Sequence, residues 1–342
     1  MNKMLEYLKN NWRLAALIAG VALIVVSAAA FLIIANVRNQ SILHSPAAAP
    51  NANVAPVASS VRVYNGLYAV SIDNHVDARP ASGIDQAAFV YEAPVEGGIT
   101  RFLAFFERGA QAAQIGPVRS ARLYFLDWIA DWGALKFFHF GGSPEAMSAI
   151  AASSSFSAAD EDGAGAGGGF FWRDATQDAP HNAYTSSDNA GKALAGDAAN
   201  GSVSAWLMEA DPDISARGAD GQKVAAPLSD LAEYSPIWVY SSATNTYTRT
   251  MGGKVEKTAA GATITAKNIV VISTGISVID GDGRLKITTA GQGQAIIYRN
   301  GQSENVTWNE TPANPSPPHF TAADGSEAAL TSGNVWIEVV KK

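Results

Sequence analysis

The longest apolar stretch of the chain lies near its start, where about 22 consecutive residues from Leu14 to Ala35 carry no charge. A helix of that length can cross a hydrocarbon core of about 30 Å. The apolar part of a cleaved export signal is usually only about 7–15 residues long, whereas here the run continues through Phe31–Ile34. The pattern therefore predicts a retained transmembrane helix over residues 14–35.

Residues 36–61 separate this apolar run from the rest of the chain. They are rich in Ala, Pro, Ser and Asn and show no periodic apolar face, which is typical of a spacer. Lys3, Lys9 and Arg13 precede the apolar run, and only one basic residue closely follows it. Because basic residues collect on the cytoplasmic side of a membrane, we expect residues 1–13 in the cytoplasm and everything beyond the helix outside the membrane.

Apolar runs with the patterns of strands and helices alternate between residues 62 and 210. The strand-like runs are LYAVSID (67–73), AAFVYEA (87–93), TRFLAFFE (100–107) and ALKFFHF (134–140). SARLYFLDWIADWG (120–133) has the pattern of an amphipathic helix with Ser120 as its N-cap, and another helix is expected to begin after Ser143. The Gly-rich run at 163–169 predicts a mobile surface loop. Together these patterns predict a mixed α/β domain.

From Ile237 onward the pattern changes to short strands separated by turns. Residues 211–232 are rich in Asp, Gly and Ala and are predicted to link two domains. Asn300-Gly301 lies between two strand-like runs and is a strong hairpin signal. We therefore expect a β-rich domain over residues 233–342, folded as a small sandwich or an open barrel. The predicted fold class of the whole chain is α+β.

The charge distribution narrows the range of partners. The chain has a formal net charge of −7, of which about +3 lies in the first forty residues and about −10 in the remainder. An acidic domain repels phosphodiester backbones, so nucleic acid is not expected as a partner. The chain has no cysteine, which excludes disulfides, thiolate metal sites and thiol catalysis.

Charged and polar groups crowd against glycines and aromatic residues between Asp73 and Ser143, and again at 170–186. Such a mixture beside apolar strands is typical of a ligand-binding cleft. Arg119 and Arg122 are three residues apart at a predicted helix start, so we expect them on one face, where they favour an anion. The predicted ligand contacts are Asn74, Arg101, Arg119, Arg122, Ser143, Trp172, Arg173 and Asn182.

Four side chains are candidates for acid–base catalysis, namely Asp73, Glu92, Glu96 and His181. On an extended strand Glu92 and Glu96 would be about 13 Å apart. That distance exceeds the separation of about 5–9.5 Å between the paired carboxylates of glycosidases, so either residue pairs more easily with Asp73. The alternative, that the carboxylates neutralise the arginines, stays open.

The histidines do not have the spacing of a metal site. His75, His139 and His181 lie on separate segments, and the sequence contains no HExxH pattern. We therefore predict no metal and no other cofactor. His181 lies in a polar turn between Pro180 and Asn182, which favours a role as an acid–base or ligand-contact group.

Several sequence blocks, in a fixed order, resemble the YerB-like bacterial family, whose two-part domain has no known function. The blocks are SIDNHVDARP (71–80), VYEAPVEGGITRFLAFF (90–106), IGPVRSARLYF (115–125), FHFGGSPEA (138–146), APHNAYTS (179–186), YTRTMGG (247–253), NIVVIST (268–274) and VWIEVV (335–340). The resemblance implies an exported, membrane-attached protein acting at the cell envelope. Many members look like lipoproteins, whereas this chain has no cysteine to carry a lipid.

Three functions are compatible with these features. The first is a membrane-anchored envelope protein that binds an anionic cell-wall glycan or peptide in the charged cleft. The second is a wall hydrolase or lyase that uses a carboxylate or His181 as its acid–base group. The third is a scaffold for membrane partners, although the sequence identifies no particular partner protein. The sequence alone does not decide between binding and catalysis.

Overall fold

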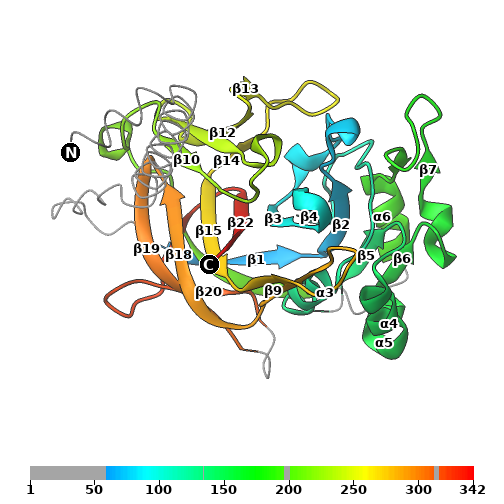
Figure 1. Ribbon diagram of the computed structural model, residues 1–342. Helices are drawn as coiled ribbons and strands as arrows, with labels where there is room; N and C mark the ends of the chain where they lie inside the picture. The colour runs from blue at the N-terminus through cyan, green and yellow to red at the C-terminus, as the bar shows by residue number, and fades with distance from the viewer. Residues whose placement is uncertain (1–58, 134, 196–200, 312–315) are drawn as a thin grey trace, which may run out of the picture. The chain divides into compact units, whose positions relative to one another are not determined.

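The computed structural model of the chain describes residues 59–133, 135–195, 201–311 and 316–342 (Figure 1). The apolar run at 14–35, predicted to form a transmembrane helix, lies outside these residues, as does its predicted cytoplasmic flank. Within the described ranges, no helix is both long enough and apolar enough to cross a membrane.

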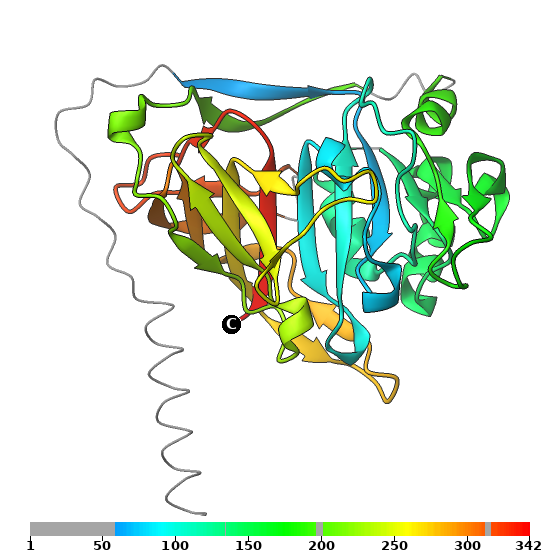
Figure 2. The same ribbon diagram turned by 90° about the horizontal axis from the view of Figure 1, so that it is seen from above.

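The described chain is mostly β and is built on one ten-stranded sheet, in which strands of the first half (blue and cyan) and of the second half (yellow to red) lie side by side (Figure 2). The strand order is β20-β19-β18-β15-β22-β3-β4-β2-β5-β6. The bounds are β2 (Tyr68–Asp73), β3 (Phe89–Pro94), β4 (Thr100–Phe106), β5 (Lys136–His139), β6 (Asp160–Asp162), β15 (Asn268–Thr274), β18 (Gly291–Arg299), β19 (Gln302–Glu310), β20 (His319–Thr321) and β22 (Val335–Lys341).

The predicted fold class, an α/β domain followed by a separate sandwich or barrel, is wrong, because the strands of both halves share this sheet. The last strand, β22, explains why. Six of its seven residues are buried, so it needs a neighbour on each side. It pairs in parallel with β15 on one side and with β3 on the other, as Figure 1 shows. The exact boundaries proposed for the individual segments stay a prediction.

A hydrophobic core covers each face of the large sheet. In β4, Leu103 and Phe105 belong to one core, whereas Phe102 and Ala104 belong to the other, as the two-residue period of a strand requires. The first core is covered by two helices and a three-stranded sheet, α3 (Leu123–Ala130), α4 (Pro144–Ala152), β1 (Ser59–Asn65), β9 (Ser202–Glu209) and β21 (Leu330–Thr331).

The second core is covered by one helix and a smaller sheet, α6 (Ser187–Leu194), β10 (Lys223–Ala225), β11 (Ile237–Ser241), β12 (Thr246–Met251), β13 (Lys254–Val255) and β14 (Thr265–Ala266). Two short hairpins complete the strands, β7 (Trp172–Arg173) with β8 (Ala183–Tyr184) and β16 (Ile276–Val278) with β17 (Leu285–Ile287). The remaining helical segments are α5 (Ser154–Ala159), η1 (Val76–Ala78), η2 (Ile84–Gln86), η3 (Glu96–Gly98), η4 (Ala166–Phe170), η5 (Ile214–Ala216) and η6 (Ala232–Tyr234).

Most local predictions are confirmed, but two are wrong. Ser143 caps α4 as expected, because its hydroxyl accepts a hydrogen bond from the backbone N–H of Ala146. Helix α3, however, begins after Arg122 rather than at Ser120, whose hydroxyl donates to the carbonyl of Phe140 instead. The Gly-rich run also forms a short helix, η4. A Cβ at Gly167 would lie 2.6 Å from the backbone of β6, so only glycine allows this packing.

Candidate functional site

Asp73, the last residue of β2, is the centre of the candidate site. Its buried carboxylate accepts three hydrogen bonds, from the backbone N–H of His75 (3.0 Å), Nε of Arg119 (3.1 Å) and Nδ1 of His181 (2.7 Å). Burial alone would raise the pKa of Asp73, but the charge of nearby Arg101 and these hydrogen bonds lower the pKa below its ordinary value. Asp73 is therefore ionised at neutral pH.

Three arginines lie near this carboxylate, namely Arg101, Arg119 and Arg122. We call them the arginine row. Arg119 pairs with Asp73, and Arg122 pairs with Glu96 (2.6 Å). Arg101 is only 6% exposed and makes no ion pair within the described part of the chain. It donates one hydrogen bond to the carbonyl of Ser120 (3.3 Å), and its Nε has no partner among the described residues.

Arg101 stays charged at physiological pH. Burial, followed by the charge of Arg122, lowers the pKa of Arg101 to about 10, which still leaves it protonated at neutral pH. Burial would raise the pKa of Glu96, but its hydrogen bond and ion pair with Arg122 bring that pKa below its ordinary value. Three guanidiniums therefore face two carboxylates, which leaves about one positive charge without compensation.

A hollow of about 250 Å³ adjoins the end of the row at Arg122. Three predicted site residues line it, namely Glu96, Arg122 and Ser143. The opposite wall is formed by the β16–β17 hairpin and includes Ile279, Arg284, Leu285, Lys286 and Ile287. The hollow thus combines charged groups with apolar walls, as small-ligand sites do.

Glu92, another predicted catalytic residue, lies in a different cluster that is closed to solvent. One carboxylate oxygen accepts hydrogen bonds from Asn74 (3.1 Å) and Thr100 (2.6 Å), and the other pairs with Arg249 (2.6 Å). Glu92 and Arg249 are both 0% exposed. The structure therefore brings Asp73, His181 and the arginines together, whereas Glu92 and the predicted ligand contact Asn74 belong to this sealed cluster.

The remaining predicted residues lie on and near the β7–β8 hairpin. The Trp172 ring is 38% exposed and stacks on Tyr184 at a centroid distance of 6.3 Å. Arg173 donates to the side-chain oxygen of Asn182, and its guanidinium lies 4.4 Å from the centre of the Phe140 ring. These contacts fix the position of the segment that carries His181.

Comparison with known proteins places this architecture in a family. Residues 54–200 match the family described as "Protein of unknown function (DUF3048) N-terminal domain", and residues 226–337 match the corresponding C-terminal domain. The chain belongs to the DUF3048 family. It is 30% identical over 279 residues to YerB of Bacillus subtilis (strain 168), described as a candidate lipoprotein, with 80% of each chain covered.

The fold is also similar to a solved structure. The crystal structure of the YerB protein from Bacillus subtilis matches with a TM-score of 0.65 and 27% identity, covering 81% of this chain and 91% of that chain. The resemblance to the YerB-like family inferred from the sequence blocks is therefore confirmed.

Sequence reasoning missed part of the sealed cluster of this DUF3048 protein. Arg249 also pairs with Glu256, and Glu338 lies beside Glu92 in register on the neighbouring strand. Glu338 accepts a hydrogen bond from Trp238 Nε1 (2.8 Å), while burial, followed by the charge of Glu92, raises its pKa well above the ordinary value. A lone acid within the apolar run VWIEVV was the signal that could have revealed it.

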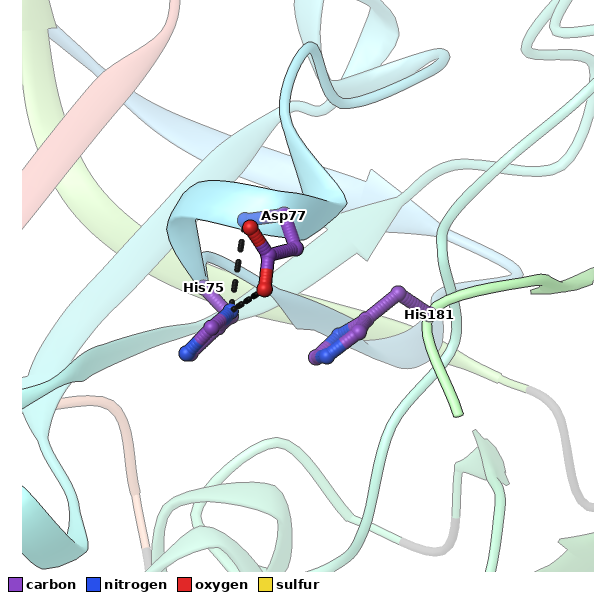
Figure 3. A group of neighbouring side chains, drawn as sticks. All are labelled: His75, Asp77 and His181. Atoms are coloured by element: carbon purple, nitrogen blue, oxygen red, sulfur yellow. Dashed lines mark hydrogen bonds and ion pairs between the residues drawn. The ribbon is translucent and has the colours of Figure 1, made fainter. Parts of the chain in front are cut away.

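The sequence analysis also did not group His181 with its two neighbours in the folded chain. The His75 ring stacks on the His181 ring, with centroids 4.8 Å apart and an interplanar angle of 15°. Asp77 lies next to His75 in this DUF3048 protein (Figure 3). The three side chains offer ligand atoms that all lie within 4.8 Å of one another. Among the described residues, they are the ones best placed to hold a metal ion, although the sequence analysis predicted none.

Proposed function

We propose that this protein works outside the cytoplasmic membrane, held at the bacterial envelope, and binds an anionic cell-wall peptide or glycan through the arginine row. The description of YerB as a candidate lipoprotein supports an envelope location. The uncharged apolar run at residues 14–35, with basic residues before it, supports attachment to a membrane.

The unpaired guanidinium of Arg101 is the observation that carries the proposal. Arg101 interacts with the charge of Asp73 but makes no direct ion pair with a carboxylate in the described chain, and a buried charge without a direct partner is costly. An anion that reached Arg101 would offset that cost, and guanidiniums bind carboxylates and phosphates through two parallel hydrogen bonds. Arg119 and Arg122 flank Arg101 and are partly exposed, which gives an incoming anion two further donors.

The hollow beside Arg122 favours a ligand with an apolar part next to its charge. Leu123 and Ile279, both more than 40% exposed, line it together with Leu285. An uninterrupted polyanion would leave these apolar walls unsatisfied. A peptide that carries a free carboxylate and small apolar side chains matches both features.

The test is calorimetric titration of the detergent-purified full-length protein with purified anionic wall peptides. We expect Arg119→Gln and Arg122→Gln each to weaken binding at least tenfold, because each removes a donor to the anion. Arg62→Gln is the matched control, since Arg62, on β1, pairs with Glu107 and does not belong to the row. Equal affinity of all three variants and the wild type would refute the proposal.

A second candidate function is hydrolysis of a wall component. The 2.7 Å contact of Asp73 with Nδ1 of His181 orients the imidazole and leaves Nε2 as a possible acid–base atom, as in other carboxylate–histidine pairs. Incubation with purified wall material would then release soluble fragments, and His181→Gln would stop the release. If folded protein still binds the peptide but releases no fragments, hydrolysis is ruled out and only the binding function remains.

A further inference from the structure

The three side chains His75, Asp77 and His181 converge from two separate segments at the surface of the protein (Figure 3). His75 and Asp77 flank the start of η1, directly after β2, while His181 precedes β8. All three are open to solvent to some degree, and Asp77 is the most exposed, with 72% of its side chain accessible. An ion could therefore reach them without any change in the fold.

His181 is already oriented as a metal ligand. Its Nδ1 donates to the ionised carboxylate of Asp73 at 2.7 Å, so the lone pair of the neutral imidazole is on Nε2. A carboxylate behind a histidine in this way fixes the tautomer and raises the basicity of the ligand nitrogen, and metal sites commonly contain this arrangement. Asp73 is therefore a positioning residue for His181.

His75 and Asp77 already have the spacing of two ligands on one ion. The distance between Nδ1 of His75 and a carboxylate oxygen of Asp77 is 3.4 Å. In a tetrahedral zinc site, with bonds of about 2.0–2.1 Å, two ligand atoms lie about 3.3 Å apart. The same Nδ1 accepts a hydrogen bond from the backbone N–H of Asp77 (3.2 Å), which a metal ion would replace.

We propose that His75, Asp77 and His181 form a binding site for a divalent transition metal ion of the zinc class. Two imidazoles and one carboxylate are a ligand set typical of zinc sites that keep a fourth position open for water or a substrate group. Binding requires the stacked His75 ring to turn so that its lone pair and that of His181 Nε2 meet at one point, while the Asp73 contact holds His181 in place. The exposure of His75 and Asp77 permits this movement. The site shares Asp73 with the arginine row but uses no arginine as a ligand, and the proposal does not depend on the proposed function.

The test uses untagged full-length protein that has been treated with a chelator and then dialysed against zinc chloride. Elemental analysis is expected to find one zinc ion per chain, and the melting temperature should rise with the zinc concentration. The Co²⁺ form should show the intense visible absorption of a tetrahedral site. His75→Ala and Asp77→Asn, both at accessible positions, should each weaken zinc binding at least tenfold.

Two further variants test whether zinc binds at these three side chains rather than elsewhere on the surface. Asp73→Asn should weaken zinc binding by about 10–100-fold, as loss of an orienting partner does. His319→Ala is the matched control, because His319 is an exposed histidine beside Glu327 with the same 3.4 Å spacing but without a second imidazole from the part of the chain that the structure describes. It should bind zinc like the wild type.

The proposal is overturned if the wild type binds no zinc, if His75→Ala and Asp77→Asn bind zinc as tightly as the wild type, or if His319→Ala loses as much affinity as they do. Arg122→Gln should leave zinc binding unchanged. A failure of peptide binding is thereby distinguished from a failure of the metal site. If a site variant does not fold, the zinc content and Co²⁺ spectrum of the wild type still decide whether a tetrahedral site exists.

Discussion

The arginine row and the sealed cluster around Arg249 meet in one strand, β4, yet they differ in how their charges are balanced. Thr100 donates to Glu92 in the sealed cluster, while the next residue, Arg101, belongs to the row. The two-residue period of β4 places neighbours on opposite faces of the sheet. One strand therefore supplies both clusters.

The difference shows how a charged group can be structural in one cluster and available to a ligand in the other. In the sealed cluster, Arg249 pairs with both Glu92 and Glu256, and the raised pKa of Glu338 keeps that acid neutral. Arg249 thus has two carboxylate partners inside the protein, and its positive charge is not available to a ligand. In the row, Arg101 remains without a carboxylate partner among the described residues, and its neighbours reach solvent. Charge density alone would not separate the two clusters.

The largest expected effect comes from breaking the sealed cluster. Arg249→Met should lower the free energy of unfolding by about 3–5 kcal/mol, because Glu92 would stay buried without its cation. Urea denaturation at neutral pH measures this loss. Arg62→Met, which breaks a partly exposed ion pair with Glu107, should cost less than about 1 kcal/mol. A loss of similar size in both variants would remove the distinction between the clusters.

A third buried cluster contains only acids, and within the described chain no basic residue balances their charge. It therefore sharpens the comparison between the other two clusters. Burial, followed by the charge of Glu310, raises the pKa of Asp131 to about 8, and burial followed by the charge of Asp127 raises the pKa of Glu310 to about 7. Both acids bind protons more tightly in the folded state than in the unfolded state. Their contribution to stability is therefore greatest at low pH and falls as the pH rises from about 4 to about 8.

The Asp131→Asn variant tests this pH dependence. The wild type should be less stable at pH 8.5 than at pH 5.5 by at least about 1.4 kcal/mol, the equivalent of one pKa unit. Asp131→Asn keeps the shape without the charge, so the difference between the two pH values should shrink. Unfolding free energies at both pH values provide the measurement. An unchanged slope would show that Asp131 ionises freely in the folded protein.

The sequence predicted local elements better than their assembly. The run TRFLAFF carries its own strand pattern, and Ser143-Pro144 carries the start of α4, so neither depends on distant residues. The position of β22 does depend on distant residues. Its apolar run shows that both sides are covered, but nothing in it specifies that β3 lies on one side and β15 on the other.

The same limit applies to the candidate site. Asp73 and His181 were both predicted, yet 108 residues separate them, and only the folded chain shows that they touch. Arg249 was missed because it alternates with threonines along β12, a pattern that is equally typical of a strand facing solvent. Asp77 was missed for a similar reason, since a lone acid after a strand end is common in turns.

A smaller effect is expected in the arginine row. Arg101→Met removes a buried charge that makes no direct ion pair in the described chain but that also favours the ionised form of Asp73, so the two effects oppose each other and the free energy of unfolding should change by less than about 1 kcal/mol. Thermal and urea unfolding beside Arg249→Met measure the contrast. If Arg101→Met were as destabilising as Arg249→Met, Arg101 would be a structural residue and the row would lose its uncompensated charge.

The smallest effect is expected at Glu338. This residue lies beside Glu92, the partner of Arg249, whose substitution has the largest expected effect. Glu338 already carries a proton, so Glu338→Gln exchanges one neutral group for another and keeps the oxygen that accepts from Trp238. We expect a change below about 0.5 kcal/mol at pH 7, whereas Glu92→Gln on the neighbouring strand should cost about 3 kcal/mol. Equal losses would mean that both acids are ionised. Arg249 would then face three ionised carboxylates instead of two.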